Sequence, residues 1–386
     1  MTNCSGRAAA MRILLISGSL PPMKCGVGDY TAHLANALSR LANTDIAVLT
    51  DVSATPKPSD FEFEVFPICR GWRMSDVARI ASAVRRWKPD LIHIQYPTQG
   101  YGERYLPWLL PVLFRIALVP VVQTWHGYDS RRMTRRFLPN SVLSGGLIVV
   151  RPEYLDMMDP LYRWLNRRKH ARFIPNASTI APTQLSEDER TAVRLRFCRP
   201  DRRLIVFFGF AYPDRGTELL FQVATAGQHH LVFISDLNAS DRYHKSILDQ
   251  AECEPWAGRV TITGYLPVEE VGRILAAADA VLLPFRDGGG MWNTSIRAAI
   301  SQGTFILTTS REQQGYNSID NAYYARPDDV ADMRNALHKY IGTRNDTTSI
   351  GLHRNWDSIA QAHVALYQTV ASSRIRNSPA GVTVPK

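Results

Sequence analysis

Short apolar runs alternate with amphipathic stretches along most of the chain. The run at residues 12–17 predicts a strand, and a loop that contains Gly26 and Gly28 follows it. Apolar residues at helical spacing from Leu34 to Leu41 then predict a helix before a second strand at 46–50. A unit of this length predicts parallel strands joined by a right-handed crossover. The pattern continues with helices at 75–87 and 106–118 and with strands at 91–95, 119–124 and 147–150.

A polar stretch at residues 178–200 separates this series from a second one. In the second series we expect strands at 203–208, 231–235, 260–263, 280–283 and 305–309, and helices at 217–226, 268–277 and 294–301. A chain of 386 residues also exceeds what one core usually supports. The sequence therefore predicts an α/β protein with two Rossmann-like, doubly wound domains, residues 11–180 and 181–354, facing each other across a cleft.

The apolar stretch at residues 105–125 invites comparison with a membrane span. It contains Arg115 and the prolines Pro107, Pro111 and Pro120, whereas a spanning helix needs about 20 uninterrupted apolar residues. A buried helix followed by a proline break and a buried strand fits the pattern better.

The net charge of +10 belongs entirely to the first half of the chain. Residues 1–180 hold 23 Lys+Arg and 13 Asp+Glu, and residues 181–386 hold 22 of each. The surplus is concentrated in two clusters, Arg131, Arg132, Arg135 and Arg136, and Arg163, Arg167, Arg168, Lys169 and Arg172. Such clusters attract phosphates or an anionic membrane surface, or they form an ordinary solvated helix face. No nucleic-acid recognition motif accompanies them, so we expect no nucleic-acid partner.

The sequence lacks the motifs of several common catalytic and metal-binding sites. The five scattered cysteines contain no C-x-x-C pair and no histidine at zinc-ligand spacing, so we expect reduced thiols, a cytoplasmic protein and no metal. A nucleophile elbow, a P-loop lysine motif and H-E-x-x-H are also missing. These gaps leave ligand binding by loops as the main source of function.

Four loops that follow predicted strands carry candidate binding residues. Gly26 and Gly28 open a helix and permit an anion near its N-terminus, although tight-turn glycines explain them equally well. The loop from Pro284 contains Gly288 and two further glycines before Thr294 and Ser295, which suits a phosphate or a flexible surface loop.

The other two loops carry a histidine and an arginine. His126 ends a buried strand, where it could contact a substrate or be a satisfied core histidine. Gly209 and Arg215 lie between a strand and a helix, where Arg215 could pair with a phosphate or only with Asp214.

Taken together, the motifs of these loops resemble family 4 glycosyltransferases of the two-Rossmann-domain (GT-B) fold. The segments that carry the resemblance are 21–31, 90–96, 124–127, 173–177, 208–216, 262–266, 276–284 and 356–367. The resemblance extends in order from about Met11 to Tyr367. It implies a closing helix at 355–371 that packs back toward the first domain, and a weakly ordered tail remains at 372–386.

The resemblance implies a nucleotide-sugar donor on the second domain, an acceptor on the first, and retaining transfer that needs no metal or other cofactor. It assigns His126 and Arg215 to catalysis. It places the donor on Gly26, Gly28, Gly209, Asp287, Gly288, Thr294, Ser295 and Arg297.

Two departures from the family pattern concern donor binding. The arginine and lysine that usually clamp the diphosphate fall on Tyr212 and Arg215, so one cation is missing. The second glutamate of the E-x7-E motif falls on Arg297, and the first falls on Gly289 or, with an insertion, on Asp287. A cation in place of a carboxylate cannot accept the ribose hydroxyls, but it could offset the missing clamp residue.

We therefore expect a hexosyl-type glycosyltransferase that extends a glycan or lipid-linked acceptor in cell-surface polysaccharide or glycolipid synthesis. Arg131, Arg132, Arg135 and Arg136 are expected to hold an acidic acceptor or to attach the enzyme peripherally to the inner membrane face. The rival interpretation is a catalytically silent protein of the same fold that binds a glycan or a partner enzyme.

Overall fold

The computed structural model describes residues 10–55, 61–127, 143–151, 153–166, 170–290, 292–346 and 355–377. The chain divides into two compact units, unit 1 (Met1–Pro175 and Trp356–Lys386) and unit 2 (Asn176–Asn355). The division after Pro175 comes five residues before the expected boundary at 180.

Unit 1 is built on a parallel sheet with the strand order β3-β2-β1-β4-β5-β6-β7. Its strands are β1 (Met11–Ile16), β2 (Thr44–Asp51), β3 (Glu64–Cys69), β4 (Leu91–Tyr96), β5 (Val121–Trp125), β6 (Gly146–Val149) and β7 (His170–Phe173). The order runs outward in both directions from β1, as in a doubly wound fold. The sequence did not predict β3 and β7, the two outermost strands.

Most helices of unit 1 alternate with these strands along the chain. They are α1 (Gly26–Ser39), α2 (Val77–Trp87), α3 (Leu106–Ile116), α5 (Glu153–Asp156), α6 (Pro160–Asn166) and α14 (Trp356–Asn377). The apolar stretch at 105–125 forms α3 and β5, as predicted. Within the described residues, no helix combines the length and apolar character needed to cross a membrane.

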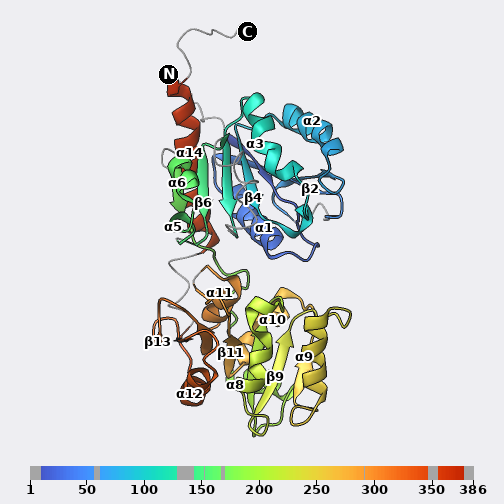
Figure 1. Ribbon diagram of the computed structural model, residues 1–386, viewed down its shortest axis with the longest axis vertical. Helices are drawn as coiled ribbons and strands as arrows, with labels where there is room; N and C mark the ends of the chain where they lie inside the picture. The colour runs from blue at the N-terminus through green and yellow to red at the C-terminus, as the bar shows by residue number, and fades with distance from the viewer. Residues whose placement is uncertain are drawn as a thin grey trace, which may run out of the picture. The chain divides into compact units, whose positions relative to one another are not determined.

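Helix α14 returns the end of the chain to unit 1 (Figure 1). It packs against α1, β6 and β7, and it buries Ile359, Leu366 and Tyr367. The helix continues to Asn377, six residues beyond the expected end of the closing helix at 371.

Unit 2 contains a second sheet with the order β10-β9-β8-β11-β12-β14-β13. Its strands are β8 (Arg203–Phe208), β9 (His229–Ile234), β10 (Val260–Ile262), β11 (Ala280–Leu283), β12 (Ile306–Thr309), β13 (Gly315–Asn317) and β14 (Ala322–Ala325). Only the pairing of β13 with β14 is antiparallel. The two Rossmann-like domains predicted from the sequence are thus confirmed.

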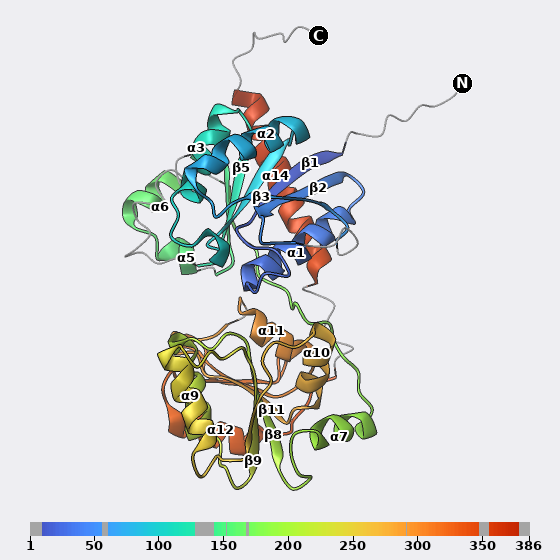
Figure 2. The ribbon, with the colours of Figure 1, turned by 90° about the vertical axis from the view of Figure 1, so that its right-hand side faces the viewer.

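The helices of unit 2 lie on both sides of this sheet, and Figure 2 shows α7 and α9 on opposite sides of β8, β9 and β11. They are α7 (Glu187–Leu195), α8 (Leu220–Val223), α9 (Arg242–Glu252), α10 (Val268–Ala277), α11 (Thr294–Ser301) and α12 (Val330–Tyr340). Helix α7 lies inside the stretch interpreted as a polar separator. A capping box formed by Ser186 and Glu189 starts it, a signal that sequence reading could have used.

Candidate functional site

Three loops at the carboxyl ends of β8, β11 and β12 meet in unit 2. A Cβ atom on Gly209 would lie 2.9 Å from Ser295 Oγ, and one on Gly216 would lie 2.3 Å from the carbonyl oxygen of Pro284. The φ angles of these glycines, +133° and +62°, also disfavour any other residue. The sequence therefore uses glycine to bring the loop after β8 against the start of α11. Gly209 and Ser295, both predicted donor-binding residues, are neighbours.

Arg215 lies in this loop cluster. Its guanidinium is 3.5 Å from Asp214 Oδ2 and stacks over the ring of Phe285 at 5.1 Å. The side chain remains 36% exposed, so it can exchange the Asp214 contact for a ligand. The structure thus shows the Asp214 pair considered from the sequence and leaves the guanidinium accessible.

The glycine-rich loop after β11 is tightly packed. Gly289 is buried, and a Cβ there would lie within 2.7 Å of Phe285, Ile296 and Thr308. Gly288 has φ +83°, and its neighbour Asp287 is exposed and pairs with Arg311 at 3.3 Å. Close packing therefore accounts for Gly289, and the positive φ angle accounts for Gly288.

Helix α11 begins beside this loop. The Asn293 side chain accepts hydrogen bonds from the backbone N–H groups of Ser295 (2.9 Å) and Ile296 (3.2 Å). Thr294 and Ser295 are partly exposed in this first turn. The helix N-terminus therefore supplies a fixed positive dipole at the carboxyl edge of the sheet.

Arg297 follows on the same helix but is only 8% exposed. Burial raises the pKa of the nearby Tyr324 to about 12, while the charge of Arg297 acts to lower it. Arg297 therefore contributes positive potential from below the protein surface.

An ionic network that the sequence analysis missed braces the same edge. Arg286 bonds Glu218 and Asp328, and the Tyr243 hydroxyl also donates to Glu218. Burial acts to raise the pKa of Glu218, but the bonds from Tyr243 and Arg286 outweigh it and lower that pKa. The backbone N–H of Arg286 also donates to the Asp214 carbonyl at 2.9 Å. This network fixes the loop that carries Arg215, and its members come from separate elements with no common motif.

In unit 1, His126 follows β5 and contacts two neighbouring elements. Its Nε2 atom lies 2.8 Å from Gln95 Oε1, and its ring packs edge-on against Tyr30 at 4.6 Å. Behind it, the Gln95 amide nitrogen lies 3.2 Å from His93 Nε2, and His93 Nδ1 lies 2.6 Å from the Tyr367 hydroxyl. This chain of contacts connects β5, β4 and α14.

A further contact connects α1 to the same helix. The Tyr30 hydroxyl lies 3.3 Å from His363 Nε2, and His363 Nδ1–H donates to the Ile359 carbonyl at 2.7 Å. Tyr30 is 1% exposed and His363 is fully buried. Sequence reading could have paired these residues only with knowledge that α14 lies against α1.

The surroundings of His126 determine its charge. Burial, with a smaller contribution from His363, lowers the pKa of His126 to about 3, so the imidazole is neutral at pH 7. Its single N–H faces Gln95, which leaves Nδ1 as a hydrogen-bond acceptor. His126 can therefore position a ligand hydroxyl, but it does not supply positive charge.

Gly26 and Gly28 open α1 as expected. A Cβ on Gly28 would lie 3.1 Å from the carbonyl group of Ser19, so close packing accounts for this glycine. Asp29 occupies the first turn, and burial raises its pKa to about 6. A carboxylate at this helix start opposes a bound anion, which favours the tight-turn explanation.

The structure says little about the remaining predicted residues. Arg131, Arg132, Arg135 and Arg136 lie outside the described residues. Within the described ranges, no group of three or more His, Cys, Asp or Glu residues is arranged to hold a metal ion. Tyr212 is 39% exposed and stacks with Phe210 at 5.9 Å.

Two Rossmann-like units with a loop cluster at the carboxyl edge define the GT-B class of fold, and comparison with solved structures agrees. Sucrose-phosphate synthase from Thermosynechococcus elongatus matches with a TM-score of 0.73 and 17% identity, covering 94% of this chain and all of that one. HepE from Anabaena, solved with UDP-glucose, matches at 0.67 and 15%, covering 95% and 100%. The catalytic domain of starch synthase IV from Arabidopsis thaliana, bound to ADP and acarbose, matches at 0.66 and 12%, covering 95% and 100%.

A comparison of the sequence with family models agrees with the resemblance. Residues 25–209 match the family model described as a glycosyl transferase 4-like domain. A search of curated proteins gives no significant match.

Proposed function

We propose that this protein transfers a sugar from a nucleotide-sugar donor bound by unit 2. The observation that carries the proposal is the convergence of Gly209, Arg215 and the start of α11 at one edge of the sheet. A helix N-terminus and an accessible guanidinium are the groups that bind a diphosphate well. The nucleotides named with the structural neighbours, UDP and ADP, support this assignment.

The difficult step in such a transfer is departure of the nucleoside diphosphate. Negative charge grows on the leaving phosphate, and preorganised positive groups stabilise it. Arg215, the α11 dipole and the buried Arg297 supply this potential without a metal ion. Since Tyr212 replaces a clamp cation of the family, we propose that Arg297 compensates from within the domain.

Unit 1 is proposed to contact the donor sugar through His126. Its Nδ1 atom has no hydrogen-bond partner among the described residues, and it can accept a bond from a sugar hydroxyl. An ionised phosphate has no proton to donate, so Nδ1 discriminates against it. This favours a sugar over a phosphate at this position, and transfer of a hexosyl group with retention of anomeric configuration is proposed from the family resemblance.

The acceptor is proposed to be a glycan or a lipid-linked sugar in polysaccharide or glycolipid synthesis. The basic surplus of the first half supports attachment of a cytoplasmic enzyme to an anionic membrane surface. An acidic acceptor held by Arg131, Arg132, Arg135 and Arg136 would use the same charge.

A panel of nucleotide-sugars, screened by thermal stabilisation and then by turnover, tests the function. A donor at 100 times its Kd should stabilise the protein by about 2.7 kcal/mol. Arg215→Gln should weaken donor binding, whereas Arg334→Gln, which removes an equal charge from α12, should not. Equal affinity in both variants would reject Arg215 as a donor contact.

The rival proposal, a catalytically silent binder, rests on Tyr212 and Arg297. It is supported if nucleotide-sugars stabilise the protein but no acceptor yields product. Turnover with any donor excludes it.

A further inference from the structure

Unit 2 contains a polar cavity that the proposed donor site does not use. Its volume is about 350 Å³, and its lining includes Thr183, Gln184, Arg190, Gln302, Arg344 and Asp346. Arg344 bonds groups that immediately precede β11 and β12, so the cavity lies at the amino ends of these strands. The donor site is proposed at their carboxyl ends.

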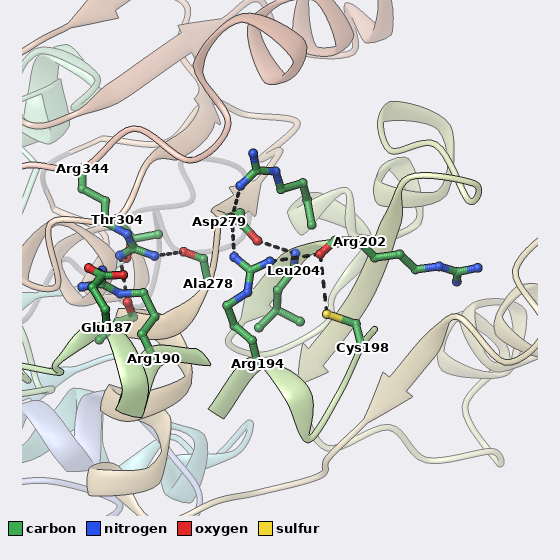
Figure 3. Close-up of polar contacts among 12 residues, drawn as sticks. Glu187, Arg190, Arg194, Cys198, Arg202, Leu204, Ala278, Asp279, Thr304 and Arg344 are labelled. Atoms are coloured by element: carbon green, nitrogen blue, oxygen red, sulfur yellow. Dashed lines mark hydrogen bonds and ion pairs between the residues drawn. The ribbon is translucent and has the colours of Figure 1, made fainter. Parts of the chain in front are cut away.

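Arg344 is held rigidly in the cavity wall. Its Nη1 donates to Thr304 Oγ1 at 3.2 Å and its Nη2 donates to the Ala278 carbonyl (Figure 3). Nη1 also donates to the Ala276 carbonyl at 2.8 Å. Within the described residues, no carboxylate lies within 4 Å of this guanidinium. Three of its five N–H groups are thus satisfied by neutral acceptors, while its charge has no direct counter-ion.

Arg190, from α7, brings a second guanidinium to the same cavity. Its Nη1 pairs with Glu187, but its buried Nε has no hydrogen-bond partner in the part of the chain that the structure describes. A buried donor without a partner is unfavourable, and an entering acceptor would satisfy it. Burial, and next the charge of Arg190, lower the pKa of Arg344 to about 10, so the two cations repel each other.

Neighbouring charges do not neutralise this pair. Arg194 pairs with Asp279 at 2.6 Å (Figure 3). Arg203 pairs with the same carboxylate at 3.0 Å, so Asp279 is already engaged by two cations. Four arginines (Arg190, Arg194, Arg203 and Arg344) thus lie in this region with three carboxylates (Glu187, Asp279 and Asp346). An anion would relieve the excess positive charge.

We propose that this cavity binds a phosphate-bearing small molecule, with Arg190 and Arg344 on the phosphate. Guanidinium groups bind phosphate oxygens through paired, charge-assisted hydrogen bonds. The cavity volume lies within the range of small-molecule sites, and Gln184 offers an amide to the rest of the ligand. Most of its lining residues belong to the first and last segments of unit 2, residues 183–190 and 344–346. A ligand bound there therefore links these two segments.

Hydrogen exchange of the full chain, with inorganic phosphate and with glucose 1-phosphate at constant ionic strength, tests this site. We expect saturable protection of residues 183–190 and 344–346. Arg190→Gln should reduce phosphate affinity about tenfold or more, since one charge-assisted contact is lost. The matched control is Arg196→Gln, which removes an exposed arginine paired with Glu270 and should retain the protection.

Protection confined to the loops after β8 and β11 would overturn the proposal, as would equal phosphate affinity in Arg190→Gln and the wild type. The same measurement on Arg215→Gln separates the two sites. That variant should lose donor binding but keep protection at 183–190. Failure of the donor proposal therefore leaves this result unaffected.

Discussion

At the residue scale, single buried polar groups determine what the candidate site can do. His126 is neutral because it lies in an apolar setting with its only N–H directed at Gln95. His93 and His363 are fully buried behind it, and burial lowers the pKa of both. Unit 1 therefore keeps three imidazoles neutral near its candidate ligand contact.

His363→Gln should make the folding stability of unit 1 less dependent on pH in the acid range. Burial lowers the pKa of His363 to about 4, while an unfolded chain has the ordinary value of 6.5. The unfolded state then binds the proton more tightly, so stability is complete above about pH 6.5 and is lost as the pH falls toward 4. At pH 5 the loss is about 2 kcal/mol.

Urea unfolding at pH 7.5 and pH 5 measures this effect. The difference in unfolding free energy between the two pH values should be about 2 kcal/mol smaller in His363→Gln than in the wild type. The control is His338→Gln, an exposed histidine of α12. An equal change in both variants would contradict the assignment.

At the scale of elements, the start of α11 belongs to the proposed donor site, and the surface of α6 combines exposed apolar residues with a basic one. Helix α11 places its N-terminus beside Gly209 and the buried glycine loop. Helix α6 instead exposes Leu161 and Trp164, each 55% accessible, with Met157 at 54% just before it. Arg163 lies between these apolar residues, so charge and apolar surface coincide.

Substitutions of Asn293 should separate helix capping from donor binding. Asn293→Ala removes a cap that accepts two backbone bonds, and we expect about 1 kcal/mol of destabilisation. Asn293→Asp keeps the cap and adds a negative charge, so stability should persist while nucleoside diphosphate affinity falls by about tenfold. Urea unfolding measures the stability of both variants, and calorimetric titration measures their affinity for a nucleoside diphosphate. Unchanged affinity in Asn293→Asp would place the diphosphate away from α11.

Removal of the exposed apolar residues of α6 should weaken attachment to anionic vesicles. Burial of apolar surface and nearby arginines both favour such a membrane surface. The double variant Leu161→Ser with Trp164→Ser should bind vesicles about tenfold more weakly in sedimentation at low salt. The control pair, Ile116→Ser with Leu118→Ser, removes side chains that are 75% and 63% exposed at the end of α3. Equal losses would indicate nonspecific adsorption.

At the scale of the whole molecule, the chain forms two separate cores with separate polar anchors. In unit 1, Tyr367 contacts buried His93 at 2.6 Å across 274 residues of sequence. In unit 2, Asp279 is 3% exposed and accepts bonds from Arg194 and from the backbone of Leu204 at 2.7 Å. Each anchor joins elements of its own unit only.

Substitutions at these anchors should act independently. Tyr367→Phe leaves His93 without this partner and should cost unit 1 about 1–3 kcal/mol. Asp279→Asn removes the charge that Arg194 and Arg203 share and should cost unit 2 about 1–3 kcal/mol. Because the sites belong to different cores, the two losses should add to within about 0.5 kcal/mol in the double variant. Hydrogen exchange assigns each loss to a unit, and strong coupling would contradict this independence.

Local periodicity was sufficient for the central elements. Strands β1, β4, β8 and β11 are buried on both faces, so their continuous apolar runs stand out from the amphipathic helices. The two outermost strands of unit 1 were missed for a different reason. Strand β3 contains Pro67, and β7 is a four-residue segment with exposed Arg172 and Phe173, so neither shows a strand pattern.

The sequence by itself determined the alternation of strands and helices, the two-domain architecture and the loops that carry Gly209, Arg215 and His126, because these depend on neighbouring residues. Only the tertiary structure decided that Gly209 meets Ser295, that Glu218 braces Arg286, and that α14 closes unit 1. Such contacts depend on strand order and helix packing, which join residues far apart in the chain. The neutrality of His126 has the same origin, since desolvation is a property of the packed core and not of its neighbours in sequence.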